Sequence, residues 1–146
     1  MSERIETAAL RDFSVSLCRA AGHSADDAAL LTDSILFAEC RGVTSHGLLR
    51  LPQYIARLRS GAMASNVPMP FTMESGGTAR LDAQNGLGQL AGRKASDKAE
   101  ELAAKYGVSF VAVANSNHFG AGAWYAIPAA RRGFFAFNIS SAASAM

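Results

Sequence analysis

The sequence predicts an α/β fold in which a helical segment, residues 1–61, precedes an incomplete, partly parallel sheet with helices, residues 62–146. In the first segment, apolar side chains recur at the spacing of three helices. In the second, short apolar runs typical of strands alternate with longer amphipathic stretches typical of helices, which favours parallel pairing. The sequence stops directly after an apolar run, so the sheet is expected to lack its final elements.

Periodicity and end signals define the first two helices. The first is expected to end near Gly22, because glycine readily adopts the left-handed conformation that closes a helix. The second begins after Ser24, which is followed three residues later by Asp27 in the manner of a capping box, and it continues to about Gly42. The apolar stripes of the two helices are formed by Leu10, Phe13, Leu17, Ala20, Leu31, Ile35 and Ala38.

A third helix is expected to start at Thr44 or Ser45, either of which can cap it, and to end near Gly61. Pro52 must then kink this helix or lie in its first turns, because proline lacks the N–H that a helix interior needs. Residues 62–77 contain two prolines and a double glycine, which indicates a loop with at most a short edge strand. The remaining expected elements are a strand at 79–83, a helix at 87–106, a buried strand at 108–114, a helix at 123–132 and a strand at 134–139.

Composition narrows the classes of function. The 146 residues are 49% hydrophobic and carry a net charge of +2, and their basic residues are scattered, which argues against a nucleic-acid partner. The N-terminus lacks an apolar leader and no window is long and apolar enough to cross a membrane, so a cytoplasmic protein is expected. Cys18 and Cys40 are both expected to be buried thiols.

The three histidines do not predict a metal centre. His23, His46 and His118 fall on three different elements, and none belongs to a pair with metal-ligand spacing. We therefore expect no bound metal. His23 lies at a junction between two helices and is expected at the surface.

The first candidate site lies on the expected third helix. At helical spacing, the side chains of His46, Arg50, Tyr54 and Arg57 share one face, separate from the leucine-rich stripe that should enter the core. An imidazole, a guanidinium that can grip a carboxylate with two hydrogen bonds, and a phenol together suit a small carboxylic acid. The same spacing also fits solvated arginines and a histidine that merely helps to cap the helix.

The second candidate site is the loop ANSNHFGAGAW, residues 114–124. It follows an expected strand and precedes a helix, and loops at the carboxyl ends of strands are where α/β proteins bind ligands. Its two glycines allow close backbone approach to an anion, and His118 adds an acid or base. An ordinary polar turn is the alternative. Upstream, residues 86–91 fit G-x-G-x-x-A, but no acidic residue ends the following strand, so these residues are expected to form a helix-opening turn.

Three motifs in this order resemble the malate/L-lactate dehydrogenase family, which is distinct from the Rossmann-fold lactate dehydrogenases. The motifs are RGVTSHGLLRLPQYIARLRSG, LDAQNGLGQLAG and NSNHFGAGAWYA, and the resemblance runs from about Thr7 to the last residue. It implies a truncated non-Rossmann dehydrogenase fold, because members of this family are more than twice as long. It also implies a protein that transfers a hydride between NAD or NADP and a 2-oxo or 2-hydroxy acid, or a cyclic imino acid.

The resemblance also implies roles for individual residues. His46 resembles the proton donor to the substrate, and Ser45 resembles the partner that orients it. Arg50 resembles the clamp for the substrate carboxylate, with Tyr54 beside it in the substrate site. The cofactor loop is matched by His118, Phe119, Gly120, Ala121 and Gly122. His118 also faces the substrate in this family and is the base in some members, so two histidines compete for one role.

Two readings of the chain as a whole remain open. In the first, it is the N-terminal portion of a cytoplasmic oxidoreductase, homodimeric at full length, that acts on a small molecule and is inactive as this portion alone. In the second, it is a non-catalytic remnant that serves as a binding or oligomerisation module. An exposed strand edge after residues 134–139 would make such a remnant prone to association.

Overall fold

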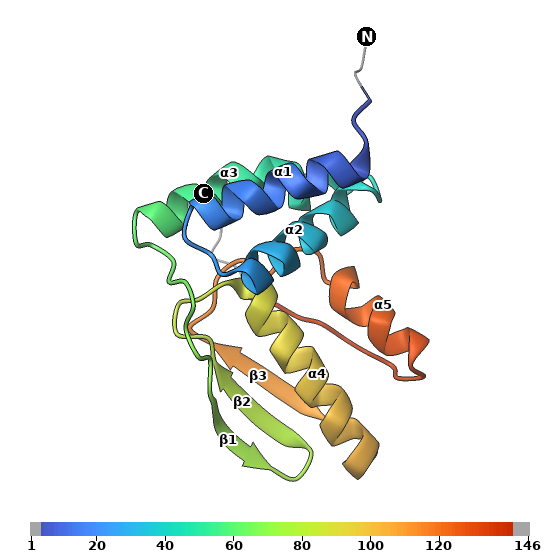
Figure 1. Ribbon diagram of the computed structural model, residues 1–146. Coiled ribbons are helices and arrows are strands. Elements are labelled where there is room, and N and C mark those ends of the chain that lie inside the picture. Colours follow the sequence, from blue (N-terminus) through green and yellow to red (C-terminus); the bar gives the residue numbers. More distant parts are fainter. Residues whose placement is uncertain (1–3, 142–146) are drawn as a thin grey trace.

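Three helices form one layer of the protein. The computed structural model describes residues 4–141, in which α1 (Thr7–Ala20), α2 (Ala25–Glu39) and α3 (Leu51–Arg59) lie together (Figure 1). The predicted cap of the second helix is confirmed, since the Ser24 hydroxyl accepts a hydrogen bond from the backbone N–H of Asp27 at 3.1 Å. Gly22, just beyond the end of α1, has a φ of 114°, which suits glycine alone.

The segment between α2 and α3 corrects the prediction of one regular helix from residue 44 to 61. Two short 3₁₀ turns, η1 (Thr44–His46) and η2 (Leu48–Arg50), precede α3, and neither begins with a side-chain cap. The backbone N–H of Leu48 donates to the Glu39 carboxylate at 2.8 Å, so α2 holds this segment in a tight turn. Pro52 lies in the first turn of α3, where its missing N–H breaks no helical hydrogen bond.

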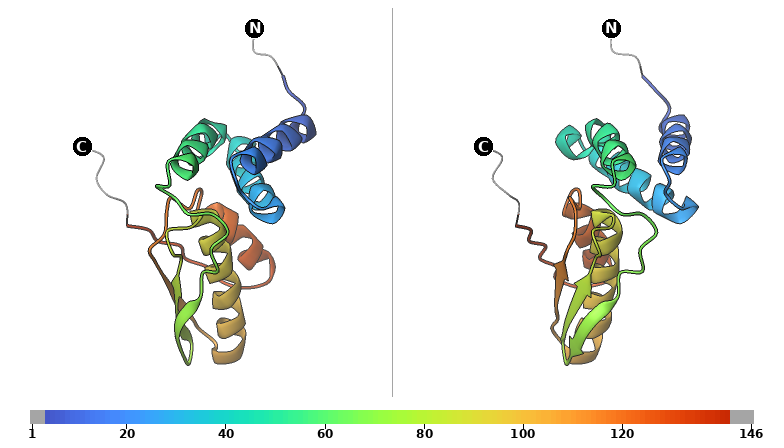
Figure 2. Two further views of the ribbon diagram at one scale, coloured as in Figure 1. Left: turned by 60° about the vertical axis from the view of Figure 1, so that its left-hand side comes forward. Right: turned by 90° about the vertical axis from the view of Figure 1, so that its left-hand side faces the viewer.

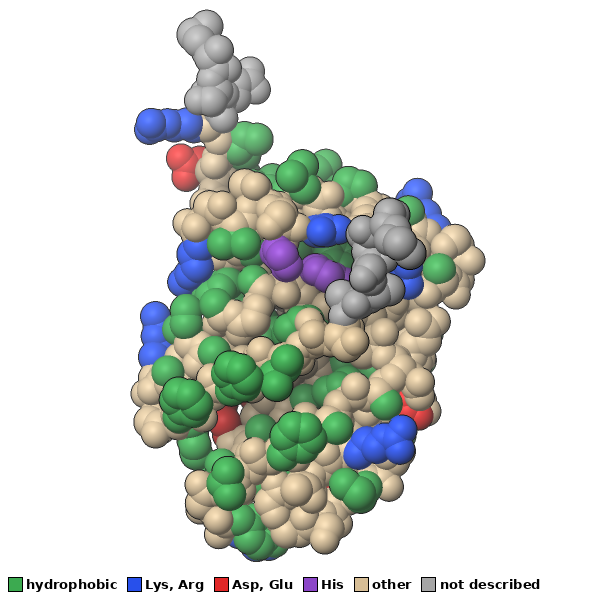
Figure 3. Space-filling model, turned by 180° about the vertical axis from the view of Figure 1, so that it is seen from behind, with side chains coloured by type: hydrophobic (Ala, Val, Ile, Leu, Met, Phe, Trp, Pro, Cys, Tyr) green, Lys and Arg blue, Asp and Glu red, His purple; other side chains and the backbone are tan. Residues whose placement is uncertain are grey.

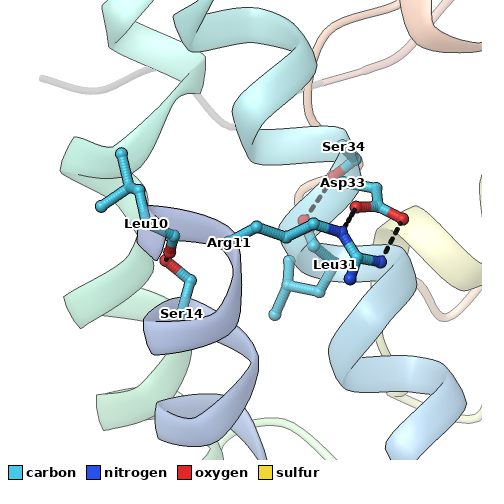
Figure 4. A network of polar contacts seen from close by, with 6 residues as sticks. All are labelled: Leu10, Arg11, Ser14, Leu31, Asp33 and Ser34. Carbon is cyan, nitrogen blue, oxygen red and sulfur yellow. Dashed lines mark hydrogen bonds and ion pairs between the residues drawn. The ribbon is translucent and has the colours of Figure 1, made fainter. Parts of the chain in front are cut away.

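The three helices share a core, and a surface ion pair links α1 to α2. Arg11 of α1 donates two hydrogen bonds to Asp33 of α2, at 2.6 and 3.0 Å (Figure 4). The hydroxyls of Ser14 and Ser34 donate to backbone carbonyls within their own helices, those of Leu10 and Leu31. The buried residues of this core come from α1, α2 and α3, from the loop after α3 and from the residue before α4: Cys18, Ala28, Leu31, Ile35, Leu51, Tyr54, Met63 and Leu87.

The second layer is a small mixed sheet covered by a long helix. β1 (Phe71–Ser75) pairs antiparallel with β2 (Thr78–Asp82), and β2 pairs parallel with β3 (Phe110–Ala114). α4 (Gly88–Tyr106) makes the crossover between β2 and β3 and packs against them, and α5 (Ala123–Arg131) lies beside α4 (Figure 1). The carboxyl end of β3 points toward the helical layer, which places the loop after β3 between the two layers (Figure 2).

Two expectations for the sheet are wrong. The strand predicted as buried has no buried residue, and Phe110 is 65% exposed, because β3 is an edge strand that pairs with β2 alone among the described residues. Residues 134–139 form no strand, and the side chains of Phe135, Phe137 and Ile139 are 95%, 78% and 74% exposed. A strand forms through hydrogen bonds to a neighbour, and within residues 4–141 no other strand pairs with this segment.

The environments of His23 and Cys40 also differ from expectation. His23 is buried rather than at the surface, and Asn66 from the loop before β1 bonds the backbone of Gly22 and Ser24 on either side of it. Cys18 is buried as expected, but Cys40 at the end of α2 is exposed. No helix among residues 4–141 is long and apolar enough to cross a membrane.

Candidate functional site between the two layers

The first half of the site is the 3₁₀ turn that carries His46. The Ser45 hydroxyl lies 3.0 Å from Nδ1 of His46, so the serine can hold one ring nitrogen and leave the other available. The Arg50 guanidinium donates to the carbonyl of Ser45 at 2.7 Å and to the side chain of Gln53 at 3.0 Å. These bonds place the imidazole and the guanidinium on one short segment, although not on the regular helix that the spacing predicted.

The second half of the site is the loop after β3, which carries His118. The side chain of Asn117 donates to the carbonyl oxygens of Asn85 and Gly86, both at 2.9 Å, and so fixes the loop to the turn before α4. The loop also crosses Gly88 so closely that a Cβ there would contact the backbone of Asn117 and His118. The helix-opening turn expected at residues 86–91 is confirmed, and its second glycine makes room for the loop.

A buried tyrosine joins the two halves. The Tyr54 hydroxyl lies 2.7 Å from Nδ1 of His118, and the side-chain amide of Gln89 in α4 donates to the same hydroxyl at 2.7 Å. Both Tyr54 and Gln89 are buried. The spacing predicts Tyr54 on a face separate from the core, but it is a core residue that also bonds His118, while the exposed Arg57 bonds Asn117 at 2.8 Å.

The two histidines meet at the junction of the layers. The ring centroids of His46 and His118 are 5.2 Å apart, with 33° between the ring planes. Figure 3 shows histidine side chains side by side on one face of the molecule, with a basic side chain next to them and hydrophobic side chains gathered nearby. The structure thus brings together the two histidines that the sequence placed on separate elements.

An open cavity of ≈ 440 Å³ lies against His46. Its wall is formed by Val43, His46, Phe119, Gly120, Ala121, Gly122, Ala123, Asn138 and Ser140. Four residues of the expected cofactor loop, Phe119 to Gly122, therefore line a cavity together with His46, whereas His118, Arg50 and Tyr54 are not part of this lining. Gly120 has a φ of 80°, which favours glycine and keeps this wall free of a side chain.

Burial and nearby charge set the protonation of the site. The pKa of His118 lies below its ordinary value because the ring is partly withdrawn from water and because His46 and Arg50 bring positive charge close to it. Burial raises the pKa of Tyr54, an effect that the Gln89 hydrogen bond and the Arg50 charge oppose. Both effects favour the neutral imidazole of His118, which can accept a proton or donate a hydrogen bond.

Three residues of the site were not identified from the sequence. Gln89 lies on a helix face otherwise given to the core, and Asn117 lies in a polar loop, so no spacing distinguishes them. Tyr125 of α5 is also buried, donates to the carbonyl of Phe119 and stacks on the Phe119 ring at 5.4 Å between centroids. Among residues 4–141, no three side chains of the metal-ligating types cluster together.

Comparison with known proteins decides the family. A family model described as malate/L-lactate dehydrogenase matches residues 5–146. The chain belongs to this family. The malate/L-lactate dehydrogenase resemblance drawn from the three motifs is therefore confirmed, and so is the α/β fold class with its partial sheet.

Individual relatives show how much of such a protein the chain represents. It is 35% identical over 138 residues to malate dehydrogenase from Pyrococcus abyssi, a match that covers 94% of this chain and 38% of that one. Over its whole length it is 33% identical to (2R)-3-sulfolactate dehydrogenase (NADP(+)) from Chromohalobacter salexigens, of which it covers 44%. The structure of malate dehydrogenase from Pyrococcus horikoshii OT3 superposes with a TM-score of 0.86 at 32% identity, covering 90% of this chain and 38% of that one. The chain thus spans less than half the length of these relatives.

Proposed function

We propose that this chain carries the acid/base residues and part of the cofactor site of an NAD- or NADP-dependent oxidoreductase. The whole protein would interconvert a 2-oxo acid and a 2-hydroxy acid, or act on a cyclic imino acid. The observation that supports the proposal best is the approach of His46 and His118 to 5.2 Å beside a cavity lined by glycines. The names of the relatives, malate dehydrogenase and sulfolactate dehydrogenase, agree with a small hydroxy acid as substrate.

The two histidines are proposed to manage the proton of the reaction. Reduction of a carbonyl builds negative charge on its oxygen, and a positioned imidazole that gives this oxygen a proton typically accelerates such a step by about 10² to 10⁴. We assign proton donation to His46, with Ser45 holding Nδ1 at 3.0 Å. His118 faces the same substrate as the alternative base. In the oxidative direction the same groups remove the proton.

Arg50 and Tyr54 are proposed to act on substrate binding in different ways. Arg50 would grip the substrate carboxylate with its planar guanidinium, which lies close enough to His118 to act on the pKa of that ring. Tyr54 would shape the substrate site by holding His118 through the hydrogen bond to Nδ1.

The loop of His118, Phe119, Gly120, Ala121 and Gly122 is proposed to contact the nicotinamide cofactor. The residues present fit this group, because Phe119, Gly120, Ala121 and Gly122 line the cavity of ≈ 440 Å³ and the two glycines allow close backbone approach there. The cofactor supplies the hydride when bound. The proposal includes both NAD and NADP, since one relative is named for NADP(+) and another carries no cofactor in its name.

A second candidate function is that of a non-catalytic module for binding or oligomerisation. The observation that favours it is the set of large apolar side chains left exposed by the sheet and the segment after α5: Phe110, Phe135, Phe137 and Ile139. Titration of the purified chain with NADH and NADPH, followed by cofactor fluorescence, separates the two candidates. Saturable binding supports the dehydrogenase proposal, whereas a module without a cofactor site gives no saturation.

The residue roles are tested in the active full-length protein. We expect His46→Ala to remove most of the turnover, because proton donation is lost. Arg50→Lys should chiefly raise KM for the acid, because a lysine cannot reproduce the two-pronged grip on a carboxylate. Unchanged kinetic constants in both variants would refute these assignments.

A further inference from the structure

We propose that Gln89 is a positioning residue that acts on His118 through Tyr54. It orients the Tyr54 hydroxyl so that this hydroxyl donates to Nδ1 of His118, which fixes the neutral imidazole in the form that carries its proton on Nε2. The consequence for catalysis rests on the proposed function, because it requires His118 to face the substrate. The tautomer itself does not depend on that function.

The geometry links three separate elements in one chain of hydrogen bonds. Gln89 lies in the second position of α4, Tyr54 lies in α3, and His118 lies in the loop after β3. Nε2 of Gln89 is 2.7 Å from the Tyr54 oxygen, which is itself 2.7 Å from Nδ1 of His118. Gln89 is fully buried and Tyr54 is 3% exposed, so the middle of the chain is shielded from solvent.

The direction of the bonds follows from the capacity of each group. The nitrogen of the Gln89 amide can only donate, so the Tyr54 oxygen accepts from it. The single hydroxyl proton of Tyr54 is then free to point at the other neighbour, Nδ1 of His118. A nitrogen that accepts a hydrogen bond carries no proton in the neutral ring, so the proton of His118 lies on Nε2.

The unused oxygen of Gln89 points to a role beyond packing. Its Oε1 is buried and has no hydrogen-bond partner among the described residues, an arrangement that costs free energy and that an apolar side chain would avoid. The arrangement with Nε2 toward Tyr54 belongs to the neutral ring, because a Tyr54 hydroxyl that donated to Oε1 could not also donate to Nδ1 of His118. When His118 takes up a proton, its Nδ1–H then donates to the Tyr54 oxygen, and the Tyr54 hydroxyl donates to Oε1. The same three residues thus serve both protonation states.

The proposal is tested on the 146-residue chain by NMR of histidine labelled with ¹⁵N, in which long-range proton–nitrogen correlations distinguish the two neutral tautomers. We expect wild-type His118 above its pKa to carry its proton on Nε2. In Gln89→Met, which keeps the length of the side chain and removes the amide nitrogen and oxygen, the ratio of the Nδ1–H form to the Nε2–H form should rise about fivefold, as expected for loss of one neutral hydrogen bond. A wild-type His118 with its proton on Nδ1, or an unchanged ratio in Gln89→Met, overturns the proposal.

A double-mutant comparison shows whether Gln89 acts through Tyr54. Tyr54→Phe alone should shift the ratio in the same direction, and Gln89→Met should add nothing in that background. An equal shift from Gln89→Met with and without the Tyr54 hydroxyl would indicate a general packing effect and refute the proposal. If Gln89→Met does not fold, Tyr54→Phe and the wild-type tautomer still decide it. Leu90→Met controls for a changed side chain on α4, and the signals of His23 serve as an internal reference.

These measurements are made without cofactor or substrate, so their outcome is separable from that of the proposed function. A chain that fails to bind NADH or NADPH but shows the expected tautomer shift retains the positioning role of Gln89 and loses the dehydrogenase proposal. A chain that binds the cofactor but shows no tautomer shift supports the dehydrogenase proposal and refutes the positioning role of Gln89.

Discussion

Replacement of Gly88 by alanine is the sharpest test of how the site is supported. An added Cβ would lie 2.7 Å from the carbonyl carbon of His118 and closer still to the carbonyl oxygens of Asn117 and His118. These are backbone atoms, which cannot rotate away as the end of a side chain can. The loop that carries His118 must therefore move, and its hydrogen bond to Tyr54 must lengthen.

The expected size of the effect follows from two opposing terms. Overpacking of a buried position typically costs about 1 to 3 kcal/mol, and contact with rigid backbone places Gly88→Ala near about 3 kcal/mol. Alanine is intrinsically better than glycine in a helix by about 1 kcal/mol, and Gly88 is the first residue of α4. The net prediction is a loss of about 2 kcal/mol in the free energy of unfolding.

Urea unfolding followed by circular dichroism measures this loss, and the ¹⁵N signals of His118 report the movement of the loop. Gly122→Ala is the matched control, because Gly122 also stands at a helix start but an added Cβ there would meet its nearest neighbour at 3.8 Å. We expect the control to unfold close to the wild type. A Gly88→Ala protein that is as stable as the wild type, with unmoved His118 signals, would refute the packing argument.

Three further predictions concern the rest of the molecule. Burial lowers the pKa of His23, so the stability that its neutral form contributes is present above about pH 6.5 and is lost as the pH falls toward the lower pKa of the folded state. In His23→Leu the midpoint of urea unfolding should therefore change less between about pH 7.5 and about pH 5 than it does in the wild type. Cys40 should react with a thiol reagent in the folded protein while Cys18, whose pKa is raised by burial, reacts only after unfolding, and equal rates would contradict the described burial. Arg11→Ala should lower the free energy of unfolding by at most about 1 kcal/mol, because the side chains of Arg11 and Asp33 are 42% and 39% exposed and water screens their attraction. Thermal unfolding measures this loss.

Local signals in the sequence predicted the regular elements well. In α1 the helix itself is confirmed but its predicted apolar stripe is wrong, because Phe13 is 59% exposed and the buried face of α1 carries Ser14 and Cys18 instead. The helices α2 and α4 have recognisable ends, such as the Ser24 cap and Gly107, which has a φ of 84° after α4. Each of these signals acts within one or two turns of chain. For that reason it is visible in the sequence without knowledge of the tertiary structure.

The departures arise where distant residues decide the outcome. The segment around His46 forms 3₁₀ turns because its backbone bonds Glu39, a contact with the preceding helix that helical periodicity does not reveal. Residues 134–139 have the composition of a strand, but composition does not supply the neighbour that a strand requires. His23 is buried, and its neighbour Ser24 bonds Asn66, which lies 42 residues later in the sequence than Ser24.

The candidate site was predicted in part. The residue types around His46 and His118 suggested acid/base chemistry, and the family resemblance placed both in one site. The chain from Gln89 through Tyr54 to His118 joins residues separated by 35 and 64 positions, and no pattern within either helix indicates it. Such partners emerge only when the loop after β3 is placed against the helical layer.

The meeting of His46 and His118 has a consequence for the mechanics of the protein. One imidazole belongs to the helical layer and the other to the layer that contains the sheet, so a molecule that binds both rings would link the two layers. Binding of that molecule would then slow amide hydrogen exchange in both layers, because the free energy of binding stabilises both against opening. Rigidity in this protein would accordingly depend on ligand concentration.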